Sequence, residues 1–104
     1  MRFEYEDEVA SEHPALAGHF PGNPVVPASL LLSRVLSAAE KARGQNLRIT
    51  ALPVAKFHAV LRPGEKFLIR LESAGTGTLN FRLLRGATLI ASGSLRHEIA
   101  GEQA

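Results

Sequence analysis

The chain contains 104 residues, of which 45% are hydrophobic, and its formal net charge is +2. This length predicts a single domain over residues 1–104, which buries enough surface to fold alone but gains from an oligomer interface. So small a charge, without a basic stripe interleaved with aromatic side chains, argues against a nucleic-acid partner. No apolar run is long enough to cross a membrane, and the acidic first ten residues lack the apolar core of a secretory signal. Because cysteine is absent as well, we expect a cytoplasmic protein.

The N-terminal half predicts one strand, a long loop and one helix. Aromatic residues alternate with glutamates in RFEYEDEV, residues 2–9, which indicates a strand. From Ser11 to Pro27 the prolines and glycines are too closely spaced for regular structure, and ordered loops of this length are usually functional. Pro27 suits the first turn of a helix over residues 28–43, and Gly44 supplies the stop signal. The first half of this helix is apolar on nearly every face, so we expect it to be buried.

The remainder of the chain, after Leu47, predicts strands. Residues 52–61, 66–73, 79–84 and 87–98 are the predicted strands, and glycine-containing turns separate them, the first at Pro63–Gly64. Three consecutive turns of this kind predict an antiparallel meander. The order of elements therefore predicts an α+β fold, in which one layer of antiparallel sheet curls over one apolar helix.

Two segments carry a family resemblance. They are GHFPGNPVVPA, residues 18–28, and AKFHAVLRPGEKFLIRLE, residues 55–72. They resemble the hot-dog-fold 3-hydroxyacyl-acyl-carrier-protein dehydratases, whose signature is His-Phe-Pro-Gly, a variable residue, Pro, two apolar residues and Pro-Gly before the helix. The resemblance spans almost the whole chain. It implies a single hot-dog, dehydratase-like domain over residues 1–104, with an antiparallel β-sheet wrapped around one long central helix.

The resemblance implies a site at the start of that helix. Removing water from a 3-hydroxyacyl thioester needs a base for the α-proton, an acid for the departing hydroxyl and donors for the developing oxyanion. The family's base corresponds to His19, and the carbonyl of Val25 would orient its imidazole. The backbone N–H groups of Gly22 and Ala28 would face the thioester oxygen. Phe20 completes the implied substrate-binding residues, and the resemblance implies no cofactor and no metal.

Position 33 departs from the family pattern, as does Ala28, which replaces a glycine. The family carries an acidic residue fourteen positions after the histidine, where this chain has Ser33. A serine hydroxyl is a far weaker acid than a carboxyl group, and general acid catalysis is worth about 10²–10⁴-fold. In the family's dimers the two catalytic residues come from opposite protomers. We therefore expect a dimer, either of identical chains or with a related hot-dog chain that contributes the acid.

Other functions remain open at this stage. Ser33 favours a non-catalytic acyl-binding subunit of a heterodimer, and a hot-dog acyl thioesterase is a further alternative. The leading hypothesis is a lyase acting on acyl-carrier-protein substrates in fatty-acid or polyketide-like synthesis. Four cations, Arg34, Arg43, Arg62 and Lys66, form either a solvated face or a docking patch for the carrier's acidic helix. The other histidines, His13, His58 and His97, lack the spacing of a metal site.

Overall fold

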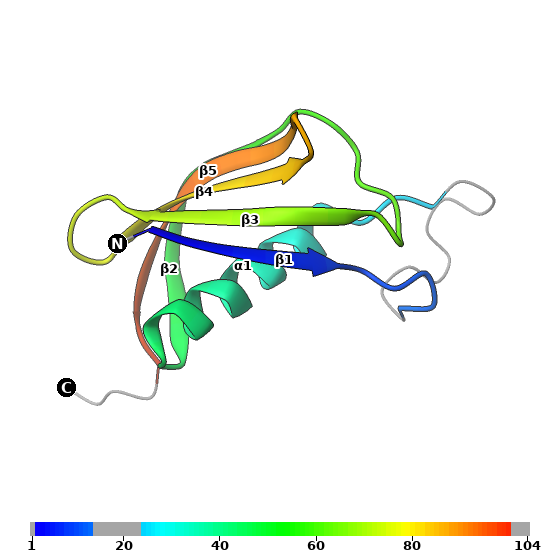
Figure 1. Cartoon of the computed structure of the whole chain (residues 1–104). Helices are drawn as coiled ribbons and strands as arrows, with labels where there is room; N and C mark the ends of the chain where they lie inside the picture. The colour runs from blue at the N-terminus through cyan, green and yellow to red at the C-terminus, as the bar shows by residue number, and fades with distance from the viewer. Residues whose placement is uncertain (1, 14–23, 101–104) are drawn as a thin grey trace.

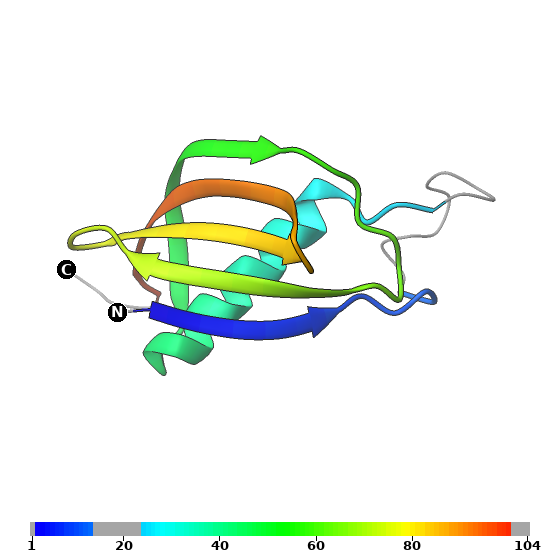
Figure 2. The same ribbon diagram turned by 45° about the horizontal axis from the view of Figure 1, so that its top comes forward.

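The computed structural model describes residues 2–13 and 24–100. Its elements are β1 (Arg2–Glu8), α1 (Ala28–Arg43), β2 (Leu47–Phe57), β3 (Lys66–Ser73), β4 (Thr78–Arg85) and β5 (Thr88–Ile99). The strands form one five-stranded antiparallel sheet in the order β1-β3-β4-β5-β2. Figure 1 shows α1 lying across one face of this sheet, and Figure 2 shows the strands side by side in the same order. The predicted α+β fold is confirmed.

Local signals set both ends of α1. Pro27 is the N-cap residue, with φ −64° and ψ 149°, and its fixed φ prepares the chain for the first turn. Gly44 ends the helix in the left-handed region at φ 67°, and its N–H donates to the carbonyl of Glu40 at 2.8 Å. Lys41 and Arg43 in the last turn complement the helix dipole. The predicted helix over residues 28–43 is confirmed to the residue.

Strands β3, β4 and β5 form the predicted meander, but β2 does not belong to it. A turn does form at Pro63–Gly64, where the N–H of Glu65 donates to the carbonyl of Arg62 at 3.2 Å. The prediction that this turn closes a hairpin is wrong, because β2 pairs with β5 and β3 pairs with β1 and β4. The predicted strand over 52–61 is also misplaced, since β2 begins at Leu47 and ends at Phe57. Residues 58–65 therefore cross the end of the sheet as a connection.

The sheet has an apolar face toward α1 and a polar outer face. Alternate residues of β3 and β4 are buried, including Phe67, Ile69, Phe81 and Leu83, and they pack with Val35 of α1 in one core cluster. Most of the residues between them, such as Arg70, Asn80 and Arg82, carry polar or charged side chains to the other face, and Leu68 and Leu84 are the apolar exceptions in these two strands. This alternation is what places the helix on only one side.

The single chain does not cover its helix on all sides, which corrects the expectation that the first half of the helix is buried. Leu31, Val35, Ala38 and Ala39 are buried against the sheet. The opposite face exposes serines spaced four residues apart, Ser29, Ser33 and Ser37. Leucines beside this face, such as Leu30 and Leu36, are only partly buried. A single sheet reaches one side of α1, so the serine face stays open.

Candidate functional site

The N-terminal end of α1 is the part of the expected site that the structure describes. Val26 is 6% exposed, and its N–H donates to the carbonyl of Leu61 at 2.8 Å. Val25 is partly buried and Ala28 is exposed as the first residue of the helix. No side chain among residues 2–13 and 24–100 caps this end. The first N–H groups of a helix lack partners within it, so those at the start of α1 can donate hydrogen bonds to a partly negative oxygen.

Three of the expected site residues, His19, Phe20 and Gly22, lie outside the described residues. Their assignment to the site stays a prediction from the motif. The described chain on either side of them is bonded to the connection between β2 and β3. On the N-terminal side, Val9 is fully buried and its carbonyl accepts a hydrogen bond from the N–H of Gly64 at 2.8 Å. Val26 bonds to the same connection at the other end.

Ser33 lies in the middle of the exposed face of α1. Its hydroxyl donates to the carbonyl of Leu30 at 2.8 Å, a local bond back along the helix. This bond occupies the hydroxyl hydrogen but leaves the side chain open to any chain that covers the serine face. The structure therefore places position 33 on the same open side of the helix as Ser29 and Ser37.

Two of the other histidines, His58 and His97, have their surroundings set by the sheet. His58 follows β2, and its Nε2 lies 3.2 Å from the hydroxyl of Ser92 on β5. His97 lies on β5, and burial lowers the pKa of its imidazole. Its Nε2 is buried and has no hydrogen-bond partner among the described residues. Within those residues no cluster of His, Cys, Asp or Glu side chains forms a metal site.

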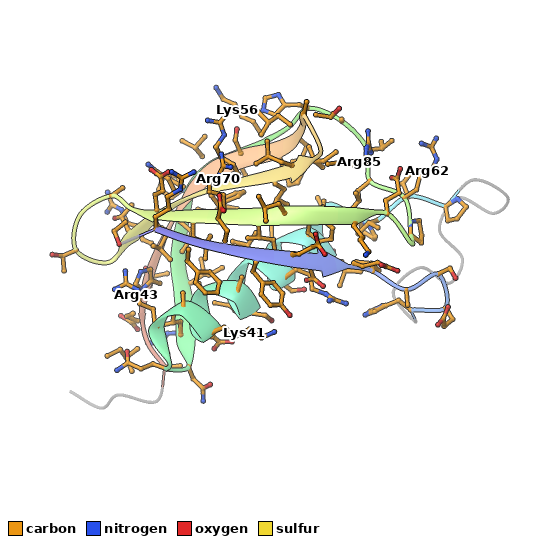
Figure 3. All side chains as sticks on the ribbon, in the orientation of Figure 1. Lys41, Arg43, Lys56, Arg62, Arg70 and Arg85 are labelled. Atoms are coloured by element: carbon orange, nitrogen blue, oxygen red, sulfur yellow. The ribbon has the colours of Figure 1, made fainter. Side chains whose placement is uncertain are left out.

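The four cations proposed as a docking patch do not gather on one surface. Arg34 is tied to Asp7 by an ion pair of 2.9 Å that joins α1 to β1. Arg43 is at the C-terminal end of α1, whereas Arg62 is in the connection at the other end of the molecule (Figure 3). Lys66 begins β3. Their separation argues against a patch made of these four residues.

Sequence reasoning missed a long exposed sheet edge along β2. Residues 51–58 are all exposed, and large apolar side chains are among them, notably Leu52, Val54 and Phe57. Phe57 is 45% exposed although it pairs with Ala91, which is buried on the helix side of the sheet. A sequence signal for this edge existed: Pro53 cannot donate to a ladder and is tolerated in strands mainly at edges and bulges. The register of β2 against β5 indeed shifts around this residue.

One antiparallel sheet over one long helix, with a proline-rich segment leading into that helix, defines a hot-dog protein. Residues 1–94 match the model of the ApeI-like family, described as ApeI dehydratase, so the chain belongs to the ApeI-like dehydratases. In the described residues no helix is long and apolar enough to span a membrane.

Individual relatives of known name match this chain at moderate to low sequence identity. The 3-hydroxyacyl-[acyl-carrier-protein] dehydratase FabZ of Lactobacillus helveticus is 42% identical over 55 residues, 46% of this chain and 37% of the relative. FabZ of Chlamydia trachomatis serovar L2 is 28% identical over 103 residues, 86% of this chain and 67% of the relative. The chain thus spans well under half of the Lactobacillus relative, at 37% of its length.

Solved structures share the fold at low identity. The dehydratase heterocomplex ApeI:P from Xenorhabdus doucetiae contains a chain with a TM-score of 0.81 and 18% identity, covering 92% of this chain and 86% of that one. The fluoroacetyl-CoA thioesterase FlK matches with a TM-score of 0.69 and 21% identity, covering 95% of this chain and 84% of that one. Likenesses at these identities show the fold, which dehydratases and thioesterases have in common.

Proposed function

We propose that this chain takes part in the dehydration of 3-hydroxyacyl thioesters carried by an acyl carrier protein, as one single-domain subunit of a hot-dog dimer. The observation that supports it most is the His-Phe-Pro-Gly sequence that precedes α1 in the chain, in a member of the ApeI-like dehydratase family. No side chain of the described residues caps this end of α1. The FabZ relatives act on acyl-carrier-protein substrates by name, which supports the substrate class.

In this proposal His19 removes the α-proton of the substrate. An imidazole titrates near neutral pH and so serves as a base at ordinary pH. The carbonyl of Val25 orients the ring, and the N–H groups of Gly22 and Ala28 donate to the thioester oxygen as the enolate-like intermediate forms. Phe20 and the helix face around Ser33 line the acyl pocket. A second proton, supplied by a separate acid, must then reach the hydroxyl so that it leaves as water.

The acid is supplied by a partner chain in this proposal. Ser33 holds a hydroxyl that already donates to its own helix, so it is a poor proton source. The open serine face of α1 leaves room for a second chain to complete the site. The ApeI:P assembly of Xenorhabdus doucetiae is a dehydratase heterocomplex, which supports a related hot-dog chain as the partner.

The edge of β2 is the surface through which we propose that the two chains join. The other edge strand, β1, carries Glu4, Glu6, Asp7 and Glu8 within seven residues, and such charges oppose pairing with a second copy. The β2 edge instead exposes apolar side chains, and Val60 of the connection after it and Ile99, which pairs with Leu47 at its start, are exposed as well. Pairing along β2 would continue the sheet and cover Phe57.

Light scattering on the purified protein tests this assembly. We expect a dimer or larger species at tens of micromolar, or a co-purifying hot-dog partner. Replacing Val54 and Phe57 together by lysine should dissociate it, because the substitutions put like charges into the joined edge. Glu6→Lys on the β1 edge is the matched control and should leave the assembly intact. A wild-type monomer without a partner would contradict the proposal.

The outer face of the sheet offers a surface for the acidic carrier. Arg82 and Lys56 both pair in register with Ser92, so they flank it on that face. Both are exposed and form no ion pair with any described residue. Arg70 lies directly opposite Arg82, and Figure 3 shows Arg70 and Lys56 on the side of the sheet away from α1. Like charges held side by side favour an anionic partner.

One alternative keeps a specific observation in its favour. Ser33 in place of the family acid fits a subunit that binds acyl groups or a catalytic partner without turning over substrate. The thioesterase alternative rests on shared fold with FlK. Turnover assays with 3-hydroxyacyl and simple acyl carrier substrates separate these cases, since only a dehydratase gives the enoyl product from the first.

A further inference from the structure

The connection between β2 and β3, residues 58–65, is hydrogen-bonded to the described chain before α1 at two places, Val9 and Val26. The carbonyl of Val9 accepts the N–H of Gly64 at 2.8 Å. The N–H of Val26 donates to the carbonyl of Leu61 at 2.8 Å. Val26 and Leu61 are both buried, so their bond lies where water competes little, whereas the bond to buried Val9 has an exposed donor in Gly64. The placement of the connection therefore determines where the chain enters α1.

Arg85, at the end of β4, in turn holds the connection. Its Nη1 donates to the carbonyl of Val60 at 2.8 Å and lies 3.2 Å from Oε1 of Glu65. The same carboxylate oxygen accepts the N–H of Arg62 at 2.7 Å, which closes the turn. Arg85 and Glu65 are each about one-third exposed. In Figure 3 Arg85 and Arg62 lie together at the end of the molecule where α1 begins.

We propose that Arg85 is a positioning residue for the proposed dehydration, acting through the connection on the N-terminal end of α1. The path runs from its guanidinium to Val60, along one residue to Leu61, and through the Leu61–Val26 bond to the chain two residues before Ala28. A planar guanidinium can hold a carbonyl and a carboxylate at once, which a single ammonium does less well. This inference rests on the proposed function for its effect on turnover.

The expected consequence of losing this contact is a misplaced helix entrance rather than an unfolded protein. An ion pair that is one-third exposed, as Arg85–Glu65 is, contributes little to stability. A displacement on the order of 1 Å at a reacting group can nevertheless lower turnover about a hundredfold. Stability and activity should therefore respond very differently to the same substitution.

Arg85→Ala tests the inference, with Arg2→Ala as the control. Arg2 also joins two elements through a glutamate, Glu72, at 3.8 Å, and it belongs to neither the proposed site nor the proposed carrier surface. We expect Arg85→Ala to lower kcat about tenfold or more with little change in KM, and added guanidinium to restore part of it. Arg2→Ala should also change the melting temperature only slightly and should leave kcat unchanged.

Amide hydrogen exchange provides a readout that needs no activity. In Arg85→Ala the N–H groups of Val26 and Gly64 should exchange about fivefold faster or more, while Gly44 at the far end of α1 should not change. Equal exchange at Val26 in the wild type and Arg85→Ala would overturn the inference. So would an equal loss of kcat in both alanine variants.

The experiment gives a different result if the proposed function is wrong but the role of Arg85 is right. A wild-type assembly without any turnover, but with faster exchange at Val26 in Arg85→Ala, would reject the dehydratase assignment and retain the contact. If Arg85→Ala does not fold, Glu65→Gln weakens the same contact while keeping an acceptor for the N–H of Arg62. It should raise exchange at Gly64 and Val26 to a smaller degree, and unchanged exchange there would count against the inference.

Discussion

Replacing Ser33 by glutamate should restore an acid to the dehydratase site of the homomer. The position is exposed on α1, and its hydroxyl donates a hydrogen bond back along the helix to the carbonyl of Leu30. A glutamate there loses this local bond but favours the helix slightly more than serine does. We therefore expect a change of no more than about 0.5 kcal/mol in the free energy of unfolding of the single chain. For a domain of this size that corresponds to at most about 4 °C in melting temperature.

Turnover should respond much more strongly. General acid catalysis contributes about 10²–10⁴-fold, and a newly placed carboxyl group will be imperfectly oriented. We expect homomer turnover to rise by roughly ten- to a thousandfold, followed by the absorbance of the enoyl thioester product. Ser33→Gln is the matched control, because it has the same shape without an ionisable proton, and it should give no gain.

Two results would refute this reasoning about position 33. A homomer that is already as fast as Ser33→Glu must take its proton from another group. An equal gain in Ser33→Gln would show that side-chain size, and not acidity, limits the reaction. If neither variant turns over substrate while both still bind the carrier or a partner chain, the non-catalytic subunit is the better assignment.

Three further predictions concern the base, the carrier and pH. His19→Ala should abolish turnover with the fold retained in circular dichroism, whereas His13→Ala should cost far less; equal losses would mean that the segment matters and not a base. Arg82→Glu should raise KM for a carrier-bound substrate about threefold to tenfold but not for the same acyl group on coenzyme A. The control variant Lys66→Glu should leave KM unchanged for both substrates, and a rise with both substrates in Arg82→Glu would argue against carrier docking at this surface. Burial lowers the pKa of His97 from 6.5, so just below that pH the unfolded chain binds more protons than the folded chain. The contribution of His97 to the free energy of unfolding is therefore fully present above about pH 6.5 and decreases as the pH falls below it. Urea unfolding from about pH 8 to about pH 5 should show this slope flattened in His97→Gln, and an unchanged slope would assign it to other groups.

Much of the local structure was predictable because its causes are local. Pro27 and Gly44 bound the helix through their own backbone preferences, and the helix ends where they predict. The alternation in KFLIRLES predicts β3 with its observed bounds. The described part of the candidate site is the start of α1, and the same local signals predicted its position, since Pro27 places Ala28 at the first helical position. Short-range sterics and periodicity are sufficient for each of these features.

Only the tertiary structure decided which strands meet and which surfaces remain open. Pro63–Gly64 is a turn in the sequence and in the fold, yet the strands on its two sides pair with different neighbours. Strand pairing depends on contacts between distant segments, and a turn signal does not report them. The exposure of Ser33 and of the β2 edge could not be predicted from the sequence either, because it depends on where the single sheet ends and stops covering the helix. Helix ends are determined by a few adjacent residues, whereas an open face is determined by the whole arrangement of the chain.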